Sequence, residues 1–135
     1  MTITKYRSAD LKLELAQELR IRLVEAAWHQ GDYFTDKDGR ACYCLVGAMA
    51  SLLAGPEASS NDLGQYEVDA GEFIAAACPE FKGNRGTQSS CGKIIDWNDD
   101  KQRTWQQVDT VVNRVVAYYR AELARDQRMG TGGFV

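Results

Sequence analysis

The sequence predicts a mainly α-helical protein: a single small domain of about four helices, with a short β-hairpin before the second helix. Its length of 135 residues suits one compact domain. Hydrophobic residues make up 44% of the chain and charged residues 26%, which is ordinary for a globular protein. Apolar residues recur at helical spacing near both ends of the chain. We expect residues 1–129 to form the domain and residues 130–135 to form a flexible C-terminal tail.

The first predicted helix begins after Ser8, a typical N-cap residue, and runs to about Gln30, before Gly31. Its apolar residues form two neighbouring arcs, so we expect it to pack on two sides. One arc contains Leu11, Leu15, Ala16, Leu19, Leu23 and Ala27; the other contains Leu13, Ile21, Val24 and Trp28. The narrow charged face contains Glu14, Glu18, Arg22 and Glu25.

A hairpin and a short apolar helix are expected next. The pair Asp38-Gly39 is a turn signal between short aromatic and small-residue runs, so it predicts the tip of a small hairpin. The following segment is almost wholly apolar and predicts a helix from Leu45 to Ala54, closed by Gly55 and the proline after it. We expect this helix to lie at the centre of the core.

The second half of the chain contains two further predicted helices. Residues 56–66 have the composition of a loop, and residues 67–81 contain a third helix that ends near Pro79. The pair Ile94-Ile95 suggests a short extended or buried segment. Thr104 and Gln107 form a capping box that opens the last helix. The apolar side of that helix contains Val108, Val111, Val112, Val115, Val116, Tyr119 and Leu123.

The middle of the chain is acidic. Residues 41–81 contain no Lys or Arg. They contain six acidic residues: Glu57, Asp62, Glu67, Asp69, Glu72 and Glu80. Nucleic-acid binding requires clustered Lys and Arg, so we expect no nucleic-acid partner. An acidic surface formed by Glu57, Asp62 and Glu67 instead predicts contact with a protein partner.

The N-terminal residues lack an apolar run of signal-peptide length, and nowhere do about 18 apolar residues follow one another. We therefore expect a cytoplasmic protein without a membrane segment. In the reducing cytosol, the four cysteines are expected to be free thiols or metal ligands rather than disulfides. Their spacing lacks the paired C-x2-C pattern of zinc sites, so we expect no metal and no cofactor.

The stretch Cys42-Tyr43-Cys44 allows a catalytic interpretation. Cys44 lies at the expected start of the second helix, where the helix dipole stabilises a thiolate. With His29 as base and Asn98 or Asp99 as orienting group, Cys44 would be the nucleophile of a thiol-dependent hydrolase or acyl transferase. The alternative is that Cys44 is a small buried hydrophobic residue.

The stretch from Trp97 to Thr104 also has two interpretations. Trp97 is either a buried anchor followed by an Asx-turn that opens the last helix, or part of a loop that faces a ligand. In the second case Asn98 and Asp99 hydrogen-bond the ligand and Arg103 adds a charge-assisted contact. The candidate binding residues are Trp28, Trp97, Asn98, Asp99 and Arg103.

Three motifs occur in one order: "WHQGDY" at 28–33, "CLVGA" at 44–48 and "WNDDKQRTWQQV" at 97–108. Together they resemble a family of small uncharacterised bacterial and phage proteins. The resemblance implies a small helical domain, a bacterial or phage source and no assigned activity. Cys44 falls on the family pattern, whereas His29 falls on a variable position and Cys42, Cys78 and Cys91 lie outside it.

Our leading prediction is a non-enzymatic accessory protein that acts by binding another protein and is associated with phage or mobile elements. Thiol-dependent catalysis by Cys44 and His29 is the alternative. A third hypothesis places a small-ligand pocket beneath Trp97, with Asn98 and Asp99 at its mouth. Small residues around Gly47 predict that another element approaches the second helix closely, so the motifs also suit a packing role.

Overall fold

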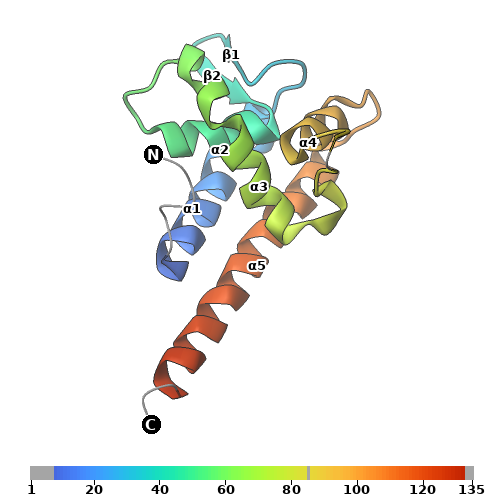
Figure 1. The fold of residues 1–135 in the computed structure, drawn as a ribbon. Coiled ribbons are helices and arrows are strands. Elements are labelled where there is room, and N and C mark those ends of the chain that lie inside the picture. Colours follow the sequence, from blue (N-terminus) through green and yellow to red (C-terminus); the bar gives the residue numbers. More distant parts are fainter. Residues whose placement is uncertain (1–7, 85, 133–135) are drawn as a thin grey trace.

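The computed structural model describes residues 8–84 and 86–132, which are mainly helical (Figure 1). Five α-helices occur in this part of the chain: α1 (Ala9–Arg22), α2 (Leu45–Ala54), α3 (Glu67–Ala77), α4 (Ser90–Asp99) and α5 (Trp105–Gly132). The strands β1 (Phe34–Lys37) and β2 (Arg40–Tyr43) form an antiparallel hairpin before α2. Short 3-10 helices are η2 (Glu25–Ala27), η3 (Ser60–Tyr66) and η4 (Pro79–Phe81). The expected helical fold with one hairpin is therefore confirmed.

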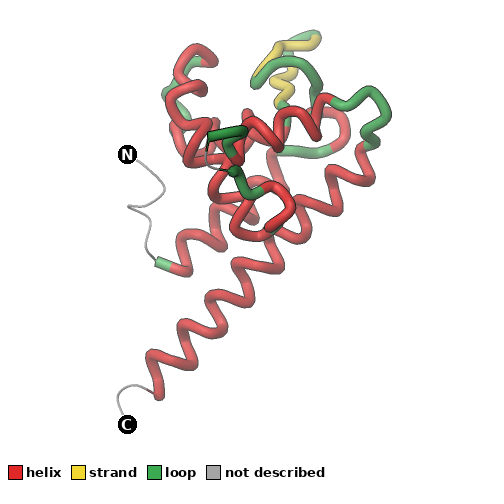
Figure 2. The backbone as a smooth tube through the Cα atoms, turned by 45° about the vertical axis from the view of Figure 1, so that its right-hand side comes forward, coloured by secondary structure: helices red, strands yellow, loops and turns green. Residues whose placement is uncertain are grey.

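Helix α2 lies at the centre of the fold and contacts α1, α3, α4, η3 and β2. Eight of its ten residues are buried, because almost all of them are apolar. Helices α1 and α5 lie side by side, and the last turns of α5 extend beyond the rest of the protein (Figures 1 and 2). The hairpin lies at the opposite end of the protein from these last turns (Figures 1 and 2).

The predicted bounds of α2 are confirmed. Cys44 is its N-cap, with extended backbone dihedrals, and Gly55 ends the helix with a φ of 94°. Glycine adopts this positive φ without strain. Gly47 allows the expected close approach, because a Cβ atom at this position would lie 1.9 Å from the Tyr33 carbonyl oxygen. The first turn of α2 therefore packs directly against the chain that enters β1.

The hairpin turn and the start of α5 also follow their predictions. Asp38 and Gly39 have φ values of 53° and 80°, as a two-residue hairpin turn of the favoured hand requires. Thr104 N donates to Gln107 Oε1 at 3.0 Å, and Gln107 N donates to Thr104 Oγ1 at 3.3 Å, which is the expected capping box. The buried apolar side of α5 contains Val108, Val111, Val112, Val115, Val116 and Tyr119.

The predicted first helix is too long. Helix α1 ends at Arg22 instead of Gln30, and the backbone of Trp28 is extended. His29 N donates to Tyr43 O at 2.8 Å, and Trp28 forms a parallel bridge with the same residue. Pairing with the end of β2 therefore replaces the helical hydrogen bonds. The second apolar arc is only partly covered, since the side chains of Ile21 and Val24 are exposed.

Two predictions for the second half of the chain need correction. The segment around Ile94 and Ile95 is helical rather than extended, because α4 begins at an N-cap in which Ser89 Oγ accepts from Gly92 N at 3.1 Å, while Ile94 is buried, as the other alternative expects. Residues 60–66 of the expected loop form η3. Helix α5 continues to Gly132, and residues 133–135 of the expected tail lie outside the described residues.

We predict that Gly47→Ala strongly destabilises the protein. The added methyl group would overlap the Tyr33 carbonyl, and backbone atoms cannot move aside as a flexible side chain can. Urea unfolding should show a loss of about 3 kcal/mol or more. The matched control is Gly64→Ala in η3, where no atom lies within 4 Å of the added carbon. The prediction fails if both variants unfold at the same urea concentration.

Candidate functional site

The three sequence motifs meet around the side chain of Asn98, which is fully buried at the end of α4. Its Oδ1 atom accepts from Trp28 Nε1 at 2.9 Å and from Leu45 N at 3.1 Å. Its Nδ2 atom donates to His29 O at 3.1 Å and to Asp99 Oδ1 at 3.0 Å. Both donors and both acceptor positions of the amide are therefore occupied within the protein. We call this cluster the Asn98 network.

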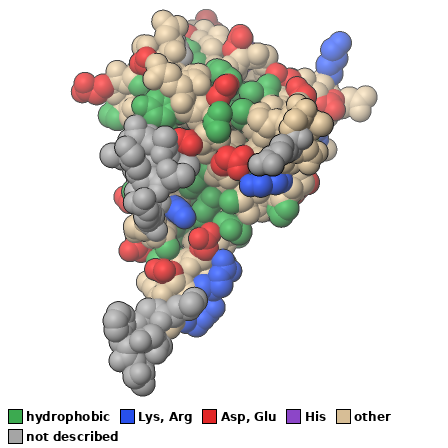
Figure 3. Space-filling model, viewed as in Figure 1, with side chains coloured by type: hydrophobic (Ala, Val, Ile, Leu, Met, Phe, Trp, Pro, Cys, Tyr) green, Lys and Arg blue, Asp and Glu red, His purple; other side chains and the backbone are tan. Residues whose placement is uncertain are grey.

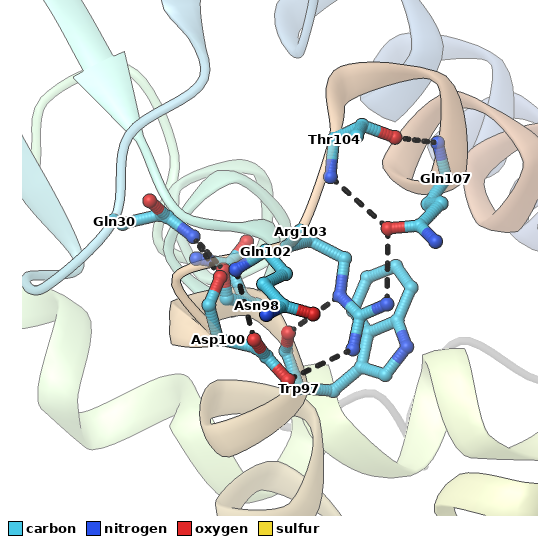
Figure 4. Close-up of polar contacts among 8 residues, drawn as sticks. All are labelled: Gln30, Trp97, Asn98, Asp100, Gln102, Arg103, Thr104 and Gln107. Carbon is cyan, nitrogen blue, oxygen red and sulfur yellow. Dashed lines mark hydrogen bonds and ion pairs between the residues drawn. The ribbon is translucent and has the colours of Figure 1, made fainter.

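Gln30 and Gly31 extend the Asn98 network to the end of α4. Gln30 Nε2 donates to Asn98 O at 2.8 Å and to Asp100 O at 2.7 Å (Figure 4). These carbonyl groups lie at a helix C-terminus, where helical partners are lacking. Gly31 N donates to Asp99 Oδ1 at 2.9 Å, and the φ of Gly31 is 106°. The Gln-Gly pair thus caps α4 from a segment 68 residues away in the chain.

Arg103 fixes the turn between α4 and α5. Its guanidinium carbon lies 4.0 Å from the centre of the Trp97 ring, in a cation–π contact (Figure 4). Arg103 Nε donates to Trp97 O at 2.7 Å, and Nη1 donates to Gln107 Oε1 at 3.1 Å. The Trp97 ring also packs edge-on against Phe81. Arg103 therefore contacts the protein both through its N–H donors and through the face of its guanidinium group.

The candidate binding residues are thus gathered in one region, but they bind one another. Trp28, Asn98 and Asp99 share hydrogen bonds, and Trp97 and Arg103 form the adjoining stack. This arrangement agrees with the interpretation of the motifs as a packing signature. The residues hold three distant segments of the chain together.

A small cavity of about 230 Å³ lies beside the Asn98 network. It is lined by Gly31, Asp32, Tyr33, Cys44, Ile95 and Asp99. Asp99 thus lies at a cavity wall, as the third hypothesis expects, whereas Trp97 and Asn98 do not line it. Among the described residues, the charged side chains of this lining are the carboxylates of Asp32 and Asp99.

Cys44 is buried, and its thiol serves as the N-cap of α2. Gly47 N lies 3.2 Å from Cys44 Sγ and donates to it. Burial raises the pKa of the Cys44 thiol to about 11, and the negative charge of Asp99 adds to this shift. The hydrogen bond from Gly47 opposes the shift without reversing it. A thiolate nucleophile requires a lowered thiol pKa, whereas the pKa of Cys44 is raised.

The His29 ring lies near Asp32. Its Nε2 atom lies 3.9 Å from Asp32 Oδ2 and is buried without a hydrogen-bond partner. In residues 8–84 and 86–132, no hydrogen bond or ion pair joins the His29 ring to Cys44. The geometry of an imidazole base acting on a thiol is therefore not formed.

A larger cavity, which the sequence did not predict, lies at the other end of α2. Its volume is about 430 Å³, and it opens between the end of α1, the hairpin and the loop that leads to η3. We call it the Arg22 pocket, since Arg22 is the one charged residue that the described part of the chain contributes to its lining. Ser51, a polar residue in the otherwise apolar α2, lies at the same pocket. Ser51 is the sequence signal that could have revealed it.

The three residues of the predicted acidic surface lie around η3. Glu57 is exposed before η3, Asp62 lies within it, and Glu67 begins α3. Asp62 Oδ2 accepts from Ser59 N at 2.9 Å and so caps η3. Figure 3 shows many acidic side chains over the broad end of the protein, and acidic and basic side chains side by side along its narrower part.

The described part of the chain contains neither a metal cluster nor a membrane span. No three His, Cys, Asp or Glu side chains are grouped there as a metal ion would require. The four cysteines are buried free thiols. None of the described helices combines the length and apolar character needed to cross a bilayer.

Comparison with known proteins gives one family. A family model described as "Family of unknown function (DUF6197)" matches residues 10–118, which is most of the chain. No curated protein and no solved structure matches. The matched range includes all three motifs of the Asn98 network.

We predict that Asn98→Ala destabilises the protein by about 3 kcal/mol, because it leaves the Trp28 indole N–H, the Leu45 N–H and the His29 carbonyl without partners. The control is Asn113→Ala on the exposed side of α5, which should change the stability by less than about 0.5 kcal/mol. Denaturant unfolding measures both. Equal stability of the two variants would refute the role assigned to the Asn98 network.

We predict that Cys44 reacts slowly with iodoacetamide in the native protein. Raising its pKa from 9.0 to about 11 lowers the thiolate fraction near neutral pH about 100-fold, and burial slows the reagent further. Mass spectrometry after timed labelling at about pH 7 measures the rate, and the same cysteine in the urea-unfolded chain is the control. Labelling as fast as in the unfolded chain would show that Cys44 is a reactive thiol.

Proposed function

The chain belongs to the Family of unknown function (DUF6197), whose description assigns no function, and we propose from its own geometry that it is a binding protein without catalytic function. Its partner is another protein, which it contacts through the acidic surface of Glu57, Asp62 and Glu67. Three observations support this proposal. The motif residues hydrogen-bond one another, the surface around η3 carries acidic side chains, and the Cys44 thiol is buried with a raised pKa.

The closed Asn98 network is the observation that carries the proposal. A catalytic site needs donors, acceptors or a nucleophile that are free to contact substrate. The amide of Asn98 has no free position, and Arg103 is held on Trp97 and Gln107. Cys44 is a neutral thiol that caps a helix. Of the groups that the sequence offered for catalysis, Cys44, Asn98 and Asp99 are therefore engaged in the fold, whereas Nε2 of His29 is buried without a hydrogen-bond partner.

The surface around η3 supports the choice of partner. Its carboxylates favour a partner face that carries Lys or Arg, because opposite charges steer association and set specificity. Val68 lies beside Glu67, and the residue is 59% exposed. An exposed apolar side chain among charges suits the mixed composition of a non-obligate interface.

The proposal includes a cytoplasmic location and a bacterial or phage source, with a role linked to phage or mobile elements. The four buried free thiols support a reducing compartment. The order of the three motifs supports the source.

The test is a triple variant, Glu57→Gln, Asp62→Asn and Glu67→Gln. The change Asp62→Asn keeps a side-chain acceptor for Ser59 N, so the cap of η3 survives. Crosslinking in intact cells of the source organism, followed by mass spectrometry, would first identify partners. With the purified partner, calorimetry should show binding weakened about 10-fold or more by the triple variant, with a clear dependence on salt.

The matched control neutralises three exposed acids elsewhere: Glu14→Gln, Glu18→Gln and Asp126→Asn on α1 and α5. It removes the same charge and should change the affinity less than about 2-fold. A partner that binds the triple variant as tightly as the unaltered protein would exclude the acidic surface. Turnover of any substrate that is lost in Cys44→Ser would exclude the non-catalytic proposal.

A further inference from the structure

The Arg22 pocket has the size and the position of a small-molecule site. Its volume of about 430 Å³ falls within the range of about 300 to 1,000 Å³ that such sites occupy. It is enclosed by the last turn of α1, both strands of the hairpin, α2 and the chain before η3. Elements from distant parts of the sequence therefore form a concave surface on a rigid, buried helix.

One positive charge is held at this pocket. Arg22 Nη1 donates to Ser51 Oγ at 2.8 Å, and Ser51 Oγ donates in turn to Ala48 O at 2.6 Å. Ser51 is 7% exposed, so the guanidinium is anchored to a buried group of α2. Among the described residues, no carboxylate lies within ion-pair distance of Arg22. The remaining N–H donors of the guanidinium are available for a ligand.

Three further residues of the lining carry large aromatic or aliphatic side chains. Phe34 and Tyr43 are direct partners across the hairpin, and their rings pack edge-on with centroids 5.4 Å apart. Leu63, a buried residue of η3, is the third. A flat ring or a short aliphatic chain fits such a surface, because it removes apolar area from water on both sides.

We propose that the Arg22 pocket binds a small organic monocarboxylate, with its carboxylate on the Arg22 guanidinium and its apolar body against Phe34 and Tyr43. The planar guanidinium fork matches a carboxylate with two parallel hydrogen bonds. Glu57 and Asp62 lie in the chain that borders the pocket, and their negative charges disfavour a dianionic phosphate. Carboxylate binding in this pocket does not depend on the proposed protein partner.

The experiment titrates the isotope-labelled full-length protein with sodium benzoate or sodium hexanoate, to about 10 mM, and follows backbone amide shifts. Saturable shifts are expected at residues 22, 34, 43, 51 and 63 with at least one of the two. Benzamide, a neutral analogue of benzoate, should bind about 10-fold more weakly or not at all. If neither carboxylate causes saturable shifts at these residues, the proposal is overturned.

Two variants distinguish an effect of the Arg22 charge from an effect on folding. Arg22→Gln keeps a donor for Ser51 and should weaken carboxylate binding about 10-fold or more. Arg20→Gln removes an exposed charge from the same helix and should leave binding unchanged. Unfolding curves check that both variants are folded. Equal binding by Arg22→Gln, or equal loss in both variants, would overturn the role of Arg22. Tighter binding of phenyl phosphate than of benzoate would overturn the preference for a monocarboxylate.

Discussion

The fold depends on the buried amide of Asn98. This side chain joins the segment before the hairpin, the first turn of α2 and the end of α4 through four hydrogen bonds. The Leu45 N–H is one of the N–H groups at a helix start that lack a helical partner, and Asn98 supplies its acceptor. The same oxygen orients the Trp28 indole. An apolar side chain at position 98 could fill the space, but it could not satisfy these groups.

Features determined by nearby residues could be predicted from the sequence. The bounds of α2 follow from an apolar run that ends at Gly55, and the hairpin turn follows from two residues that tolerate a positive φ. The end of α1 could not be predicted, because His29 bonds to Tyr43 across the fold rather than along a helix. The segment 90–99 contains a Ser-Cys-Gly start and β-branched residues, and its helix depends on packing against α2 and α3.

The sequence motifs named candidate residues but not their contacts. The structure shows that Trp28, Asn98 and Asp99 share hydrogen bonds with one another. Whether a polar side chain contacts a ligand or its own protein depends on distances that a sequence does not contain. Arg22 was placed on a charged face of a helix, where most arginines are solvated. Only the folded structure brings it to the buried hydroxyl of Ser51.

The sequence separation of these contacts affects how the chain reaches its structure. Apart from the bond between the neighbours Asn98 and Asp99, the hydrogen bonds of Asn98 join residues 53 to 70 positions apart, so large loops must close before they form. The hairpin and α5 are stabilised by contacts between residues close in the chain, which form early. We therefore expect the network to form late in folding. We expect a substitution at Asn98 to accelerate unfolding while leaving the folding rate nearly unchanged, which stopped-flow kinetics would measure.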